Sequence, residues 1–316
     1  MKKVLLVILA VVMITCLFVS CAKNNETSVI NISMPDGAPA LAMAKLMKDF
    51  TYENYVVNFE IVPGVNEITA RLSQKTANIA MLPTNIATKL YANNLDIRLI
   101  SSNVFGVLYL VGTEEITSLN QLKGQTIQCI GQGGTPEFML KFILETNSIS
   151  LDEVDIQYQS DGSSIIPLLK TGSAKFALLG EPAATMSTEK AGTKILFNLQ
   201  DEWKKLTGFD GYPQASTIAT VDTITNHSGF LKAFNKAMLE NKEWIKENSA
   251  DVNSILKEYG SAVTFANNTV IANCNIDFVS ATDAKDSITV YLETMQSYNP
   301  AFIGGIPDDA FYQIIE

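Results

Sequence analysis

VNFEIVPGVNEITARLSQKTANIAMLPTNIAT, residues 57–88, aligns without a gap on VDIQYQSDGSSIIPLLKTGSAKFALLGEPAAT, residues 154–185, at an offset of 154 − 57 = 97. Both stretches begin with apolar residues in alternation, a pattern typical of a half-buried strand. Each continues with an apolar pair at the i, i+4 spacing of one helix face, Ile68 and Leu72 in the first copy. Each ends with a short apolar run suited to a strand covered on both faces. The chain therefore contains two halves built in a similar way.

A loop rich in Gly and Pro precedes each copy at the same offset. MPDGAPALA occupies residues 34–42, and GQGGTPEFM occupies residues 131–139. Ligands of open parallel sheets bind beyond the carboxyl ends of the strands, so we expect both loops to face one cleft between two lobes. Thr135 is expected to cap the second helix, with Pro136 at its first position. The first loop lacks such a side chain, and Asp36 or a ligand would satisfy its amides.

The pattern predicts an α/β fold of two Rossmann-like lobes joined by two crossing strands. Strands are predicted at residues 29–34, 55–62, 79–82 and 97–101, and again at 126–131, 154–159, 176–179 and 195–199. Their alternation with helices favours parallel sheets with right-handed crossovers. Residues 107–111 would leave the first lobe, and residues 215–221 would return to it. Lobe 1 would comprise residues 29–110 and 216–316, its last part mostly helical, and lobe 2 residues 111–215.

The composition excludes several classes of protein. The formal net charge is −10 and the only arginines are Arg71 and Arg98, whereas nucleic-acid binding needs clustered cations. Cys129 and Cys274, both in apolar surroundings, are expected to be buried free thiols. Without a Cys-His cluster, no zinc site is expected.

The N-terminus carries an export signal. Lys2 and Lys3 precede an apolar stretch at residues 4–19 that is too short for a confident membrane span. Residues 1–20 resemble a bacterial lipoprotein signal peptide, in which Cys21 becomes the lipidated first residue, and residues 21–28 form a polar tether. The alternative is an uncleaved anchor. Both predict an extracytoplasmic protein attached to the cell membrane.

Three phrases carry a resemblance to a known family: MLPTNIATKLY at residues 81–91, GQGGTPEFML at residues 131–140 and LLGEPAATM at residues 178–186. The chain resembles the substrate-binding proteins of ABC importers, in the branch related to binders of nitrate, alkanesulfonate, taurine and thiamine precursors. The resemblance spans residues 28–300. It implies a type II periplasmic-binding-protein fold, a monomer that closes around one small molecule and then docks on an ABC permease with its ATPase.

The expected cleft loops contain acidic residues, among them Asp36, Asp161 and Glu181, and no Lys or Arg. These loops are residues 36–39, 63–65, 83–85, 133–137, 161–164 and 180–182. A ligand with N–H donors fits the acids better than an anion does, so the first hypothesis is a heteroaromatic amine of the pyrimidine or thiamine-precursor kind, stacked on an aromatic side chain. A sulfonate or nitrate held by helix-start amides is the alternative.

The candidate ligand-binding residues are Asp36, Ala38, Pro39, Thr84, Asn85, Phe105, Gly134, Thr135, Asp161, Glu181 and Tyr212. Structural roles compete with ligand contact at most of them. The two aspartates sit where Asp stabilises turns, and the threonines and the asparagine can cap helices. Glu181 is favoured at a helix start by the helix dipole alone, and Phe105 and Tyr212 can be core residues.

Catalysis has no support in the sequence. His227 is the only histidine, and it is expected to cap a helix or lie on the surface. No Ser or Cys of a cleft loop has a His partner, and GQGG lacks the third glycine of a dinucleotide fingerprint. We therefore predict a solute-binding protein without cofactor or metal. A ligand-sensing lipoprotein without transport is the alternative.

Overall fold

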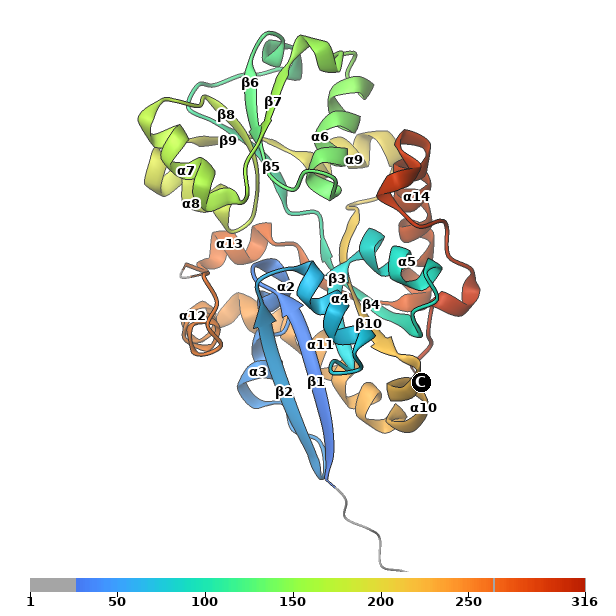
Figure 1. Cartoon of the computed structure of the whole chain (residues 1–316). Coiled ribbons are helices and arrows are strands. Elements are labelled where there is room, and N and C mark those ends of the chain that lie inside the picture. Colours follow the sequence, from blue (N-terminus) through green and yellow to red (C-terminus); the bar gives the residue numbers. More distant parts are fainter. Residues whose placement is uncertain (1–26, 264, 316) are drawn as a thin grey trace, which may run out of the picture.

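The computed structural model describes residues 27–263 and 265–315. The predicted signal peptide, Cys21 and most of the tether lie outside the described residues. The described chain forms two α/β lobes, each built around its own sheet (Figure 1). Lobe 1 has the strand order β11-β4-β10-β3-β1-β2, and lobe 2 has β7-β6-β8-β5-β9.

The strands lie close to their predicted positions. Lobe 1 contains β1 (Ser28–Pro35), β2 (Tyr55–Val62), β3 (Ile79–Pro83), β4 (Ile97–Phe105), β10 (Pro213–Thr220) and β11 (Ile276–Ser280). Lobe 2 contains β5 (Leu108–Gly112), β6 (Thr126–Cys129), β7 (Asp155–Tyr158), β8 (Phe176–Gly180) and β9 (Lys194–Asn198). The sequence did not predict β11, whose five residues are half-buried and lack a period-two pattern.

The sheets are mixed, so the prediction of parallel sheets is wrong for the strands that follow a crossing. β1 pairs in parallel with β2 and β3, and β6 pairs in parallel with β7 and β8. β10 is antiparallel to β3 and β4, and β5 is antiparallel to β8 and β9. A strand that arrives from the other lobe enters its sheet at the cleft edge, where the parallel strands end, and therefore runs in the opposite direction.

The helices of the two lobes include two pairs that keep the offset of 97 residues found in the sequence repeat. Those of lobe 1 are α2 (Ala38–Leu41), α3 (Ala44–Asp49), α4 (Val65–Ser73), α5 (Thr84–Ala92), α10 (Val221–Asn226), α11 (Ser228–Glu247), α12 (Ser249–Glu258), α13 (Asn268–Asn273) and α14 (Ala281–Tyr298). Those of lobe 2 are α6 (Thr135–Thr146), α7 (Gly162–Thr171), α8 (Ala183–Ala191) and α9 (Leu199–Thr207). The N-caps of α2 and α6 are Gly37 and Gly134 (134 − 37 = 97), and those of α4 and α7 are Gly64 and Asp161 (161 − 64 = 97).

The last helix joins the two lobes. α14 packs on β4 and β10 of lobe 1 and on α6 of lobe 2, and one hydrophobic core runs through both lobes beside it. Tyr291 of α14 stacks on Tyr212 with ring centroids 5.9 Å apart, and it meets Trp203 of α9 edge-on at the same centroid distance. Beyond α14, the chain forms two short 3-10 turns, η4 (Pro300–Phe302) and η5 (Asp309–Phe311).

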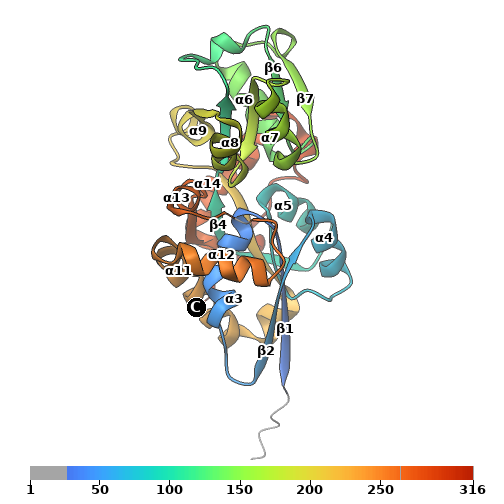
Figure 2. The ribbon, with the colours of Figure 1, turned by 90° about the vertical axis from the view of Figure 1, so that its left-hand side faces the viewer.

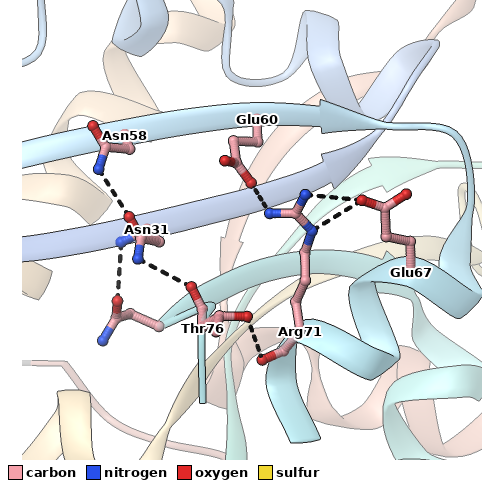
Figure 3. A network of polar contacts seen from close by, with 7 residues as sticks. Asn31, Asn58, Glu60, Glu67, Arg71 and Thr76 are labelled. Atoms are coloured by element: carbon pink, nitrogen blue, oxygen red, sulfur yellow. Dashed lines mark hydrogen bonds and ion pairs between the residues drawn. The ribbon is translucent and has the colours of Figure 1, made fainter. Parts of the chain in front are cut away.

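The outer edge of lobe 1 is held by polar contacts. Arg71 of α4 forms ion pairs with Glu60 of β2 and with Glu67, one turn earlier in its own helix (Figure 3). Asn58 Nδ2 donates to Asn31 Oδ1 at 2.9 Å between β2 and β1. Arg71 therefore ties α4 to the edge strand β2.

The start of the described chain lies far from the second lobe. In the side view, β1 begins at the end of lobe 1 opposite lobe 2 (Figure 2). Within residues 27–263 and 265–315 no helix combines the length and the hydropathy needed to cross a membrane.

Candidate functional site

A cavity of about 480 Å³ lies between the two lobes, at the carboxyl ends of β1, β3 and β8. Both Gly/Pro loops line it, as the sequence predicted. Its walls are formed by Pro35, Asp36, Gly37, Ala38, Pro39, Val65, Asn66, Pro83, Asn85, Ile86, Val104, Val107, Leu108, Ile130, Gly131, Gln132, Gly133, Gly134, Thr135, Pro136, Gly180, Glu181, Gln214 and Ala215.

The crossing segments form the floor of this cavity. The Gly106 amide donates to the Tyr212 carbonyl at 3.0 Å, so the outgoing and returning chains lie side by side. The Val107 amide donates to Gln214 Oε1 at 3.1 Å, and the Val107 carbonyl accepts from the Glu181 amide at 3.0 Å. Val107 and Gln214 were not among the predicted site residues. The available signal was that Val107 begins one predicted crossing strand and Gln214 immediately precedes the other.

The first loop turns at Gly37, where φ is 91°, a value that favours glycine. A Cβ on Gly37 would lie 4.0 Å from the carbonyl oxygen of Glu181, so the loops of the two lobes face each other across the cavity. The Asp36 carboxylate accepts from the Gly37 amide at 2.8 Å, from Ser261 Oγ at 2.5 Å and from the Ala262 amide at 2.7 Å. Asp36 therefore ties the loop to the segment that follows α12.

The second loop opens α6 in a different way from the prediction. The N-cap is Gly134 and not Thr135, and it makes no side-chain cap. Thr135 begins the helix itself, and its Oγ1 lies 2.8 Å from the hydroxyl of Tyr291, the buried α14 residue. The expected capping role of Thr135 is wrong because the residue lies one position inside the helix, where its side chain turns to the core.

Glu181 is the most buried acid of the cavity, with 5% of its surface exposed. Its Oε1 accepts from Thr185 Oγ1 at 2.6 Å and from Asn273 Nδ2 at 2.9 Å, and its Oε2 accepts from the Thr185 amide at 3.1 Å. Burial raises the pKa of Glu181 above its usual value, and these hydrogen bonds oppose that rise. The carboxylate links lobe 2 to α13 of lobe 1.

Thr84 and Asn85 begin α5, whose N-cap is Pro83. Thr84 points into the core, with its Oγ1 2.8 Å from Ser216 Oγ. Asn85 lines the cavity and is 1% exposed, and its Nδ2 donates to the Phe302 carbonyl at 3.0 Å. Neither side chain is a helix cap, the alternative that the sequence had left open.

Four candidate residues lie outside the cavity wall. Thr84 is one of them, and Tyr212 is fully buried in the aromatic contacts around Tyr291. Phe105 lines a separate cavity of about 560 Å³ behind the crossing segments. Asp161 caps α7 by accepting from the Ser164 amide at 2.9 Å, and hydrogen bonds, first that from the Ser163 hydroxyl, lower its pKa to about 2. The structure therefore brings together Asp36, Ala38, Pro39, Asn85, Gly134, Thr135 and Glu181.

The wall of the cavity is mainly aliphatic. Half of its 24 residues are Pro, Ala, Val, Ile or Leu, and five are Gly. Among the described residues that form the wall, none is Lys, Arg or His and none is aromatic. In the described part of the chain, no three His, Cys, Asp or Glu residues are grouped so as to hold a metal ion.

The two lobes with a ligand-sized cavity between them define the fold class, that of the type II periplasmic binding proteins. The structure is similar to that of an ABC transporter from Parabacteroides distasonis, with 25% identity and a TM-score of 0.79 over 92% of this chain and 100% of that chain. The aliphatic sulphonate binding protein SsuA of Escherichia coli matches with 12% identity and a TM-score of 0.70 over 90% of this chain and 91% of that chain. The nitrate-binding protein NrtA of Synechocystis PCC 6803 matches with 12% identity and a TM-score of 0.62 over 87% of this chain and 82% of that chain.

The family is shown by the sequence itself. The model of the NMT1/THI5-like family matches residues 57–252, and the chain belongs to this family. The resemblance to the substrate-binding proteins of ABC importers is thereby confirmed at the level of family and fold. No curated protein sequence matches this chain significantly.

Proposed function

We propose that this protein is an extracytoplasmic solute-binding protein that captures one small molecule between its lobes and delivers it to an ABC importer. The observation that carries the proposal is the cavity of about 480 Å³, walled by the Gly/Pro loops of both lobes. A cavity of this size suits a small metabolite, and a ligand that touches both lobes favours their closed arrangement. The closed form is then the one that docks on the permease.

We propose a neutral or amine-bearing ligand with a compact apolar body, such as a heteroaromatic amine of the pyrimidine or thiamine-precursor class. The only charged side chains of the described wall are Asp36 and Glu181. The aliphatic and Pro side chains of the wall supply flat apolar contact for a ring, whereas the predicted stacking partners Phe105 and Tyr212 lie elsewhere.

A small anion is the second candidate, and one observation favours it. The loop Gly131–Thr135 lines the cavity at the start of α6, a helix of 12 residues, and the amides of a helix start attract anions. The SsuA and NrtA relatives are named for sulphonate and nitrate binding. The absence of a cation from the described wall places this candidate second.

The tether is a further part of the proposal. Cys21 would carry the lipid that holds the protein at the outer face of the cell membrane, and β1 begins at the end of lobe 1 far from lobe 2 (Figure 2). A membrane-anchored sensor on the same scaffold is the alternative role. A neighbouring permease and ATPase gene pair supports transport, and their absence supports the sensor.

Mass spectrometry of small molecules released from freshly purified protein tests capture directly. A thermal-shift screen of pyrimidines, alkanesulfonates and nitrate ranks the ligand classes, because a ligand at 100 times its Kd adds about 2.7 kcal/mol to the free energy of unfolding. Stabilisation by one class supports capture and names the class. A protein that releases no small molecule and is stabilised by none of these compounds contradicts the proposal.

A further inference from the structure

A second cavity lies behind the crossing segments. It measures about 560 Å³, and its walls come from α9 and residues 209–211 on the side of lobe 2 and from α11, α13 and β11 of lobe 1. In the side view, α9, α13 and α14 lie on the left, whereas α4 and α5 lie on the right (Figure 2). This cavity shares none of its described wall residues with the cavity between the Gly/Pro loops.

Gln200 of α9 brings an amide without a hydrogen-bond partner to this second cavity. The residue is 5% exposed and lines the wall. Its backbone amide donates to Asn198 Oδ1 at 3.0 Å, but its side-chain amide has no hydrogen bond to the described part of the chain. Neither Oε1 nor Nε2 belongs to the polar atoms of the described residues that lack both a partner and contact with solvent. A molecule in the cavity can therefore reach this amide, a group that proteins rarely bury without a partner.

Two glycines of the crossing segments hold the Gln200 side chain in place. A Cβ on Gly106 would lie 2.5 Å from Gln200 Cγ, and a Cβ on Gly211 would lie 2.4 Å from Gln200 Oε1. Gly106 also has a φ of 41°, a left-handed value that favours glycine. The Gln200 side chain therefore packs on the backbone of both segments, at the point where the two lobes join.

Asn275 supplies an acceptor with a fixed orientation from lobe 1. It lines the same cavity, and its Nδ2 donates to the Gly106 carbonyl at 2.9 Å and to the Asn273 carbonyl at 3.0 Å. A flipped amide would place its oxygen against these two carbonyls, so Oδ1 points away from them. Because Gly106 contacts both Gln200 and Asn275, the two side-chain amides flank one residue of the outgoing segment.

The rest of the wall offers apolar surface and no net charge. Phe105, a predicted stacking partner, lines this cavity together with Phe209, and both residues are half-buried. Two cations and two carboxylates line the wall as well, and each has an ion-pair partner: Lys242 with Asp277 at 2.6 Å, Lys246 with Glu243 at 3.0 Å and Asp210 with Lys204 at 2.5 Å. A wall whose charges are already paired favours a neutral ligand.

We propose that this cavity is a second ligand-binding site, which takes a neutral aromatic molecule that carries a primary carboxamide. The carboxamide oxygen accepts from Gln200 Nε2, and its two N–H groups are donors for Gln200 Oε1 and Asn275 Oδ1. The attached ring fits the apolar surface of the two phenylalanines. Because Gln200 belongs to lobe 2 and Asn275 to lobe 1, an occupant held by both favours one arrangement of the lobes. The site goes beyond the proposed capture of a solute in the cleft.

The test uses three probes that share one ring and differ in the polar group. Benzamide carries both the donors and the acceptor, N,N-dimethylbenzamide lacks the donors, and benzamidine is a cation with donors only. In calorimetry, wild type is expected to bind benzamide about tenfold or more tightly than either of the other probes, the scale of one or two lost hydrogen bonds.

Gln200→Glu gives a readout that a purely structural role would not produce. The new side chain has nearly the shape of glutamine, so it still fits against the two glycines, but it offers only acceptors. Its carboxylate can pair with both nitrogens of benzamidine, and the preference is expected to reverse in favour of that probe. A glutamine that only fills space gives no such reversal.

A second variant leaves the crossing segments unaltered. Phe209→Ala removes one ring from the wall and is expected to weaken the binding of benzamide about fivefold. The matched control is Gln214, which lies on the cleft side, where it lines the cavity of about 480 Å³ and accepts from the Val107 amide at 3.1 Å. Gln214→Leu is expected to leave the affinity for benzamide unchanged, because it alters the cleft and not the second cavity.

The outcomes separate this inference from the proposed function. If wild type does not bind benzamide, or if Gln200→Glu keeps the preference of wild type, the inference is overturned. If Gln200→Glu does not fold, Phe209→Ala decides, and an unchanged affinity for benzamide in that variant overturns the inference. Loss of benzamide binding in Gln214→Leu would place the probe in the cleft and also overturn it. Capture of a solute stands or fails separately, with the small molecule released from the purified protein.

Discussion

The hydrogen bond between Thr135 and Tyr291 should couple lobe 2 to α14, and a double-mutant cycle can measure it. Thr135 is 4% exposed and Tyr291 is fully buried, and their hydroxyl oxygens lie 2.8 Å apart. Tyr291→Phe leaves the Thr135 hydroxyl buried without this partner, and Thr135→Val does the same to the tyrosine. Each single change is expected to lower the free energy of unfolding by about 2 kcal/mol, the cost of one unsatisfied buried polar group.

The double variant should lower the free energy of unfolding by about as much as either single variant. The reason is that the second substitution removes the hydroxyl that the first one left without a partner. The expected coupling energy is therefore about 2 kcal/mol, within the range for residues in contact. Thr135→Ser keeps the hydroxyl and serves as the control.

Urea unfolding followed by circular dichroism and by tryptophan fluorescence, to which Trp203 and Trp244 both contribute, measures these energies. The Trp203 ring is 5.9 Å from that of Tyr291 and belongs to the core that runs through both lobes, so we expect the two transitions to coincide. The coupling would be refuted if the change in the free energy of unfolding of the double variant equals the sum of the two single changes within about 0.3 kcal/mol.

Three further predictions, two of them substitutions, test other parts of the structure. Asp161→Ala should cost about 1 kcal/mol at neutral pH, the value of an exposed N-cap. Because the pKa of Asp161 is lowered from 3.8 to about 2, the cap stabilises the folded state above pH 3.8 and is lost as pH falls towards 2, so the gap between variant and wild type should close in acid urea titrations. Asp36→Ala removes the acceptor of three hydrogen bonds and should lower the free energy of unfolding by about 3 kcal/mol, whereas a cost below about 0.5 kcal/mol would contradict the tie to the α12–α13 connection. Burial raises the pKa of Cys129 to about 12 and also that of Cys274, so an aromatic disulfide reagent at pH 8 should label these thiols only after denaturation, and rapid labelling of the native protein would contradict their burial.

Much of the fold could be predicted because its causes are local. Alternating apolar residues, apolar pairs at helix spacing and Gly/Pro loops are all short-range patterns, and the offset of 97 residues between them is visible in the chain alone. The structure places the N-caps of four helices and the starts of β3 and β8 at this offset. The meeting of both loops at one cavity also followed, since parallel strands end at a common edge.

Strand direction after a crossing could not be read from the pattern. An apolar run such as that of β10 looks the same whether the strand enters its sheet from the cleft or from the far edge. β11 could not be predicted for a similar reason. It forms by pairing with the free edge of β4, and its own residues show no alternation of buried and exposed positions.

The sequence by itself determined two similar α/β halves, a set of acid-bearing cleft loops and the family. Only the tertiary structure decided how the polar groups of those loops are used. Asp36 and Glu181 accept hydrogen bonds from segments more than 90 residues away, Ser261 and Asn273, and Asn85 meets the carbonyl of Phe302. These hydrogen-bond partners come together only when the chain crosses between the lobes, so no spacing in the sequence indicates them. The sequence therefore shows the charge of a loop but not which of its polar atoms are hydrogen-bonded.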